Sequence, residues 1–96
     1  MNNNSLSITD ALVAYLRENG LEQSVLEAQI EEVWPKVMGD TVTKLTRSVE
    51  VSNGLLVVRV NSAALKAQLF ENRFELVAKL NEAFGANVIN DCRILG

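Results

Sequence analysis

The sequence predicts one α+β domain, in which helices cover a three-stranded sheet. Three observations predict this class. Apolar residues alternate with polar ones on both sides of Asn53-Gly54, which is typical of a β-hairpin. Apolar residues at helical spacing come before and after this hairpin, and the run 88–95 has the composition of a third strand. The expected order is therefore helices, two strands, one or two helices and a final strand, all within residues 1–96.

Residues 7–44 form the helical part of the predicted domain, after a flexible tail at residues 1–6. Ser7 or Thr9 can cap the first helix, and Asn19-Gly20 can end it. Its expected apolar face carries Ile8, Leu12, Tyr15 and Leu16. One or two such helices precede the hairpin.

The segment 21–46 continues as helix, with an apolar stripe that should face the core: Ile30, Val33, Trp34, Val37 and Met38. We interpret Trp34 as a core residue, since an aromatic side chain on such a stripe is usually buried. Pro35 lacks a backbone N–H and disfavours helix at Trp34, so we expect a break or kink there, with Pro35 in the first turn of a new helical piece. Gly39 should either permit close packing or end the helix.

Residues 45–96 form the hairpin–helix–strand part. A two-residue turn at Asn53-Gly54 sets the register, and it places the pairs Val51–Leu56, Val49–Val58 and Arg47–Val60 on the face toward the core. The other face carries Ser48, Glu50, Val57 and Arg59, with Glu50 placed where it can pair with Arg59.

A helix should begin after the second strand, capped by Asn61 or Ser62. Its apolar residues recur at helical intervals: Leu65, Leu69, Leu76, Leu80 and Phe84, with Phe74 and Val77 beside them. The stretch Phe70-Glu71-Asn72-Arg73 marks a bend between two helices, and Gly85 ends the second.

Composition argues against an enzyme. The chain has no histidine and one cysteine, which removes most metal sites and every nucleophile–histidine pair. Cys92 lies in an apolar run and is interpreted as a small buried hydrophobe, while the carboxylates are expected on solvated faces. We therefore predict no catalytic residue, no metal, no cofactor and no small-molecule substrate.

The N-terminal residues show no secretory signal, and no apolar run is long enough to span a bilayer, so we expect a cytoplasmic protein that does not enter a membrane. The formal net charge is −3. Charge is uneven, because residues 1–34 carry six acids and one base whereas residues 35–96 carry six acids and eight bases. The second part can therefore hold a weakly basic surface.

The chain resembles the DciA-like family, long catalogued as a bacterial domain of unknown function. The resemblance covers about residues 26–95 and rests on "WPKVMG" followed by "LT", then "NGLLVVRVNSAALKAQL", then "LNEAFGANVINDCRI". It implies a KH-like domain of the type II order, helix–strand–strand–helix–helix–strand. Where KH domains that clamp single strands carry Gly-x-x-Gly, this chain has residues 70–73 without glycine.

The resemblance also implies a non-enzymatic adaptor in DNA replication initiation, with the replicative helicase and DNA as partners. We expect DNA binding to be weak and independent of sequence, through phosphate contacts of Arg59, Lys66 and Arg73. Arg47 and Arg93 belong to the same set of basic residues. Phe70 is the candidate contact with a protein partner. The alternative is a protein–protein interaction module that does not bind nucleic acid and uses its acidic N-terminal helices.

Overall fold

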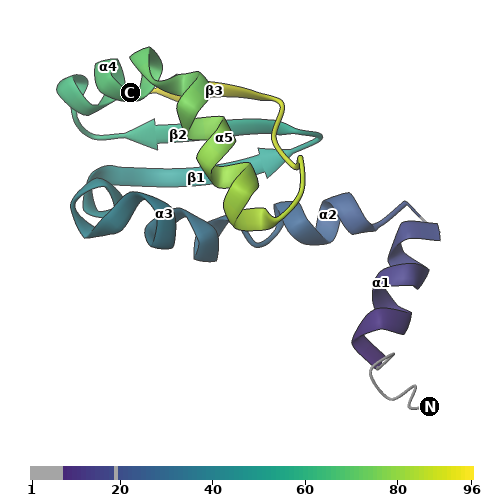
Figure 1. Ribbon diagram of the computed structural model, residues 1–96. Helices are drawn as coiled ribbons and strands as arrows, with labels where there is room; N and C mark the ends of the chain where they lie inside the picture. The colour runs from purple at the N-terminus through teal and green to yellow at the C-terminus, as the bar shows by residue number, and fades with distance from the viewer. Residues whose placement is uncertain (1–7, 19) are drawn as a thin grey trace.

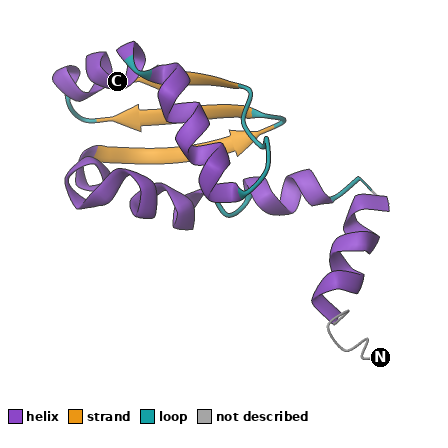
Figure 2. Ribbon diagram, in the orientation of Figure 1, coloured by secondary structure: helices purple, strands orange, loops and turns teal. Residues whose placement is uncertain are grey.

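A computed structural model describes residues 8–18 and 20–96, without the side chains of residues 9, 13 and 16. The elements are α1 (Ile8–Glu18), α2 (Glu22–Glu27), α3 (Ile30–Leu45), β1 (Thr46–Ser52), β2 (Leu55–Val60), α4 (Ala63–Glu71), α5 (Arg73–Phe84) and β3 (Asp91–Leu95). The protein is thus of the α+β class, with a three-stranded sheet packed by helices (Figures 1 and 2). The expected tail and Ser7 lie outside the described residues, as does the side chain of Thr9.

The sheet is mixed. Its order is β1-β2-β3, with β1 antiparallel and β3 parallel to the central β2. Val51 pairs with Leu56 and Val49 with Val58, as the Asn53-Gly54 turn predicts. Both turn residues have positive φ, 51° and 82°, which is the conformation of a type I′ turn.

The predicted strand pair between Arg47 and Val60 is wrong. Val60 pairs with Thr46 instead of Arg47, because the register shifts between Thr46 and Ser48. This β-bulge gives β1 one residue that has no partner in β2. Arg47 is consequently exposed.

Helices cover one face of this sheet, as α5 crossing in front of the strands shows in Figure 2. On this face Leu56, Val58 and Val60 of β2 are buried. Leucines of α4 and α5 complete the core with them: Leu65, Leu69, Leu76 and Leu80. Ser48, Glu50, Val57 and Arg59 alternate with the inward residues, and the faces therefore follow the predicted parity.

Trp34 lies in this core with 1% of its surface exposed. Its Nε1–H donates to Thr46 Oγ1 at 3.1 Å, and the Thr46 hydroxyl donates in turn to the Val42 carbonyl at 2.8 Å. The interpretation of Trp34 as a core residue is confirmed. The hydrogen bonds join α3 to the first residue of β1.

The break or kink expected at Pro35 lies instead at Gly39. Helix α3 runs through Pro35, and its non-helical residue is Gly39, with φ 83° and ψ 174°. Proline removes one helical hydrogen bond, to the carbonyl of Glu31, and Glu31 is exposed so that water can replace it. A Cβ at Gly39 would meet no atom within 4 Å, so this glycine serves the kink and not close packing.

The apolar face of α1 is not buried in the described structure. Ile8, Leu12 and Tyr15 are exposed, and Leu16 lies outside the described side chains. Figure 1 shows α1 projecting away from the sheet and its helices. This accounts for the elongated shape, with extents of 55 × 24 × 20 Å.

The bend expected at residues 70–73 is present. Helix α4 begins after Ser62, whose Oγ accepts a hydrogen bond from the Leu65 N–H at 3.1 Å. Asn72 separates α4 from α5 with φ −106° and ψ 22°, and its side-chain amide donates to the Gln68 carbonyl at 2.8 Å. The turn between the two helices is therefore fixed by side-chain as well as backbone bonds.

Glu27 has a buried carboxylate that joins α2 to the hairpin turn. The expectation that the carboxylates lie on solvated faces is therefore wrong for this residue. Its Oε2 accepts hydrogen bonds from Gln23 Nε2 at 2.8 Å and from the Gly54 N–H at 2.7 Å. The Gln23 amide also donates to the Val88 carbonyl. Burial by itself raises the pKa of Glu27, but the hydrogen bonds from Gln23 and from the backbone of Gly54 and Asn53 outweigh it and hold the pKa below its ordinary value.

Candidate nucleic-acid interface

Arg59 lies on the face of the sheet that the helices leave open. Its neighbours across the strands are Ser48 in β1 and Leu95 in β3. The side chain is exposed. In the part of the chain that the structure describes, the ion pair that is present joins Arg17 to Glu22 at 2.9 Å. Glu50 therefore makes no ion pair with Arg59 there. The guanidinium of Arg59 is thus available to a ligand.

Lys66 is exposed on the first turns of α4. It lines a shallow hollow together with Arg47, Asn61 and Ser62. The bulge in β1 is what leaves Arg47 free to reach this place. The structure therefore brings together two basic residues that the sequence had placed on different elements.

Arg73 occupies a different position, at the bend between α4 and α5. It is half-buried, and its Nη1 donates to the Phe70 carbonyl at 2.9 Å. The guanidinium also contacts the rings of Phe70 and Phe74. Arg59, Lys66 and Arg73 thus come from β2, from α4 and from the α4–α5 bend, and Arg73 is already engaged by its own chain.

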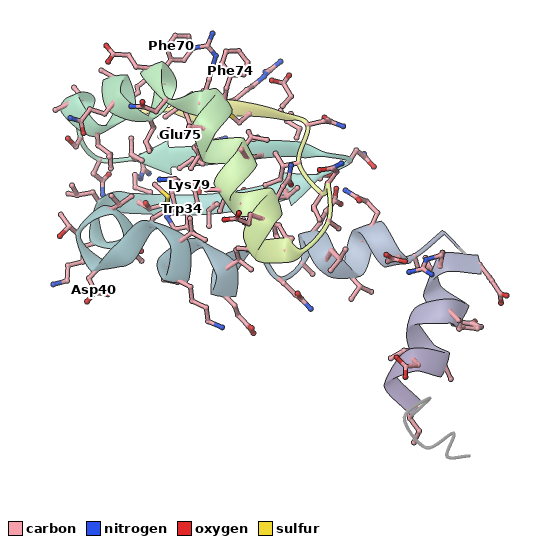
Figure 3. The ribbon with its side chains drawn as sticks, viewed as in Figure 1. Trp34, Asp40, Phe70, Phe74, Glu75 and Lys79 are labelled. Atoms are coloured by element: carbon pink, nitrogen blue, oxygen red, sulfur yellow. The ribbon has the colours of Figure 1, made fainter. Side chains whose placement is uncertain are left out.

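Two phenylalanines are exposed at the same bend. Phe70 is 55% and Phe74 is 78% exposed, and Figure 3 shows both rings pointing away from the body of the protein. The prediction that placed Phe74 beside the core is wrong. A helix turns by about 100° per residue, so Phe74 lies about 200° from the buried Leu76, which is a signal that the sequence did contain.

The groups that could do chemistry are few. Cys92 is half-buried, and burial followed by the charge of Asp91 raises the pKa of its thiol, against a smaller opposite effect of Arg73. A raised pKa keeps the thiol protonated and unreactive. Within the described part of the chain, His, Cys, Asp and Glu form no cluster of three that could hold a metal ion. No helix in that part has the length and apolar character to cross a bilayer.

A comparison with known protein families shows to which family the chain belongs. The family model described as "Dna[CI] antecedent, DciA" matches residues 7–94. The chain belongs to the DciA family. DciA proteins are associated with loading of the replicative helicase, and membership therefore indicates a role related to DNA replication. No curated protein matches the chain.

Proposed function

We propose that this DciA protein is a non-enzymatic adaptor of the replicative helicase that also binds DNA weakly and without sequence preference. The family match over residues 7–94 is the observation that carries the helicase association. The proposal for DNA rests on basic side chains that make no ion pair in the described structure. We place this activity in the cytoplasm, where the chromosome is replicated.

We further propose a KH-like architecture of the type II order, and the order of the elements supports it. From α3 to β3 the elements follow the order helix–strand–strand–helix–helix–strand, and the last strand is parallel to the middle one. The place of the Gly-x-x-Gly loop is occupied by residues 70–73, without glycine. Close approach of a phosphate to the backbone, which glycine permits, is not expected at this bend.

Phosphate contacts are assigned to the free cations. Arg59 on the open sheet face and Lys66 beside Arg47 are exposed and available. Arg73 remains a proposed nucleic-acid contact, but it acts together with the aromatic rings that hold it and is not assigned a phosphate. Because this proposal uses only a few cations for phosphate contacts, we expect a low affinity.

The test is a salt titration of labelled single-stranded and double-stranded DNA with the wild type and with Arg59→Ala/Lys66→Ala. Each lost contact lowers the slope of log affinity against log salt by about 0.7 for single strands and about 0.9 for duplex. We expect the double variant to reduce the slope and to weaken binding equally for different sequences. Lys36→Ala/Lys44→Ala, which removes two exposed charges from α3, is the matched control.

Helicase association is tested separately with the purified replicative helicase of the same organism. We expect a complex with the wild-type chain by size-exclusion chromatography and more helicase bound to single-stranded DNA in its presence. Absence of a complex with the helicase, free or on DNA, would refute the adaptor role.

The alternative is a protein-interaction module without DNA binding, and one observation favours it. Helix α1 exposes Ile8, Leu12 and Tyr15 and projects from the domain. A helix with an uncovered apolar face suits a protein partner. Helicase binding by the wild type with no DNA binding, even at low salt, would favour this alternative.

A further inference from the structure

Three residues at the α4–α5 bend form an exposed stack, which we call the aromatic stack: Phe70, Arg73 and Phe74. The guanidinium carbon of Arg73 lies 4.2 Å from the centre of the Phe70 ring and 4.7 Å from that of Phe74. Both distances are within the range of a cation–π interaction. One planar cation thus contacts both rings.

The geometry of the bend holds the stack in place. Arg73 is fixed by its hydrogen bond to the Phe70 carbonyl, and Asn72 by its bond to the Gln68 carbonyl. The rings are nevertheless largely exposed, and Figure 3 shows them projecting at the end of α4 and the start of α5. Exposed aromatic side chains held in one orientation lose little conformational entropy when a ligand covers them.

We propose that the aromatic stack is a platform on which unpaired bases of single-stranded DNA stack. This inference rests on the DNA binding proposed above and adds where the bases lie. Aromatic rings and arginine guanidinium planes are the surfaces that proteins use for unpaired bases, and every base has a π face that can cover them. Bases in a duplex are already stacked, so the platform selects single strands.

A small hollow beside Phe74 offers polar groups to the edge of a base stacked on that ring. It is lined by Arg73, Phe74, Val77, Asn90, Asp91 and Cys92. Asp91 Oδ1 accepts the Cys92 N–H at 2.8 Å, which leaves the second oxygen for another donor. Amide and carboxylate groups at this rim can bond the N–H groups on the edge of a base stacked on Phe74.

Charge around the stack argues that phosphates do not bind there. Glu71 and Glu75 flank it in sequence and are exposed, and Asp91 lies at its rim. Phosphate groups are therefore held elsewhere, and stacking at the bend contributes affinity that depends little on salt. The low salt dependence of stacking distinguishes the platform from the phosphate contacts of Arg59 and Lys66.

The experiment measures binding of fluorescent oligodeoxynucleotides, single-stranded and duplex, to the wild type, Phe74→Leu and Phe74→Trp. Leucine keeps an apolar side chain and removes the π face, and we expect it to weaken single-strand binding about tenfold. Duplex binding and the salt slope should stay unchanged. Tryptophan should retain single-strand affinity, and its emission should be quenched by the oligonucleotide above the background of buried Trp34.

The controls keep the result interpretable. Thermal unfolding of each variant shows whether the fold is intact, and Phe84→Leu replaces a phenylalanine of α5 that lies outside the stack. Unchanged single-strand affinity in a folded Phe74→Leu, with a normal wild-type salt slope, would overturn the platform and leave the proposed DNA binding in place. Loss of helicase binding in that variant with unchanged DNA affinity would assign the stack to a protein partner instead. No DNA binding by the wild type would overturn both proposals.

Discussion

The carboxylate of Glu27 accepts a hydrogen bond from the backbone N–H of Gly54, with 2.7 Å between Oε2 and N. This bond joins the end of α2 to the tip of the hairpin. The same turn is held from its other side, because the Gly54 carbonyl accepts from the Asn90 N–H at 2.9 Å. Three segments that are distant in sequence therefore meet at one turn.

Glu27→Gln is expected to destabilise the protein in a pH-dependent way. The folded-state pKa of Glu27 lies below its ordinary value of 4.5, so the ionised carboxylate stabilises the fold. This contribution is complete above pH 4.5 and is lost as the pH falls through the folded pKa. We expect a decrease of about 1–2 kcal/mol in the free energy of unfolding at pH 7, since bonds to a charged acceptor are lost.

Urea unfolding of the wild type and Glu27→Gln from pH 7 to pH 3 measures this difference, which should shrink toward the acid end. Glu32→Gln, at an exposed position of α3, is the control and should change little at any pH. A difference for Glu27→Gln that is equal at pH 7 and pH 3 would contradict the assignment.

Gly54→Val should destabilise the hairpin. Valine resists a φ of 82°, and a Cβ at this position would lie 2.7 Å from the Asn90 side-chain nitrogen. We expect a loss of about 1–3 kcal/mol, from left-handed backbone strain together with displacement of Asn90. Asn53→Gly is the matched control, because glycine accepts the positive φ of that residue. A melting temperature equal to that of the wild type would argue against this turn.

Gly39→Ala tests the kink in α3. With φ 83° and ψ 174°, Gly39 has a backbone conformation that is essentially restricted to glycine, and alanine should cost about 1–3 kcal/mol. No atom crowds the position, so the loss would report on the backbone alone. Pro35→Ala is the comparison, and it should retain or increase stability because α3 is helical there. The reverse order of the two variants in denaturant unfolding would place the kink at Pro35.

The hairpin, the Ser62 cap and the α4–α5 bend were predictable because each depends on local sequence. Asn53 and Gly54 both tolerate the positive φ that the two central residues of a type I′ turn require, and the turn then sets the strand register. Ser62 caps through a bond to a residue only three positions away. The bulge at Arg47 was not predictable in this way, since it depends on how α3 enters β1 through Trp34 and Thr46.

The other failures share a physical cause, which is that helical spacing does not show what covers a helix. An apolar helix face predicts burial, but the side chains of Ile8 and Leu12 in α1 are exposed in the described structure. From the sequence, Glu27 looked like any exposed acid, because the Gly54 N–H that binds its carboxylate lies far along the chain in the hairpin turn. The cations Arg59, Lys66 and Arg73 could be named from sequence, but the engagement of Arg73 by Phe70 and Phe74 depends on the bend between α4 and α5.

The mixed sheet also implies an order of folding. The β1–β2 hairpin closes over a two-residue turn, whereas β3 reaches β2 only after the whole of α4 and α5. Loop closure costs more entropy for the longer connection, so the hairpin can form early and the parallel pairing must follow the docking of both helices. Until β3 arrives, one edge of β2 offers unpaired N–H and C=O groups next to apolar side chains. That transient edge is where a second, partly folded chain would add a strand, and pairing with β3 removes it.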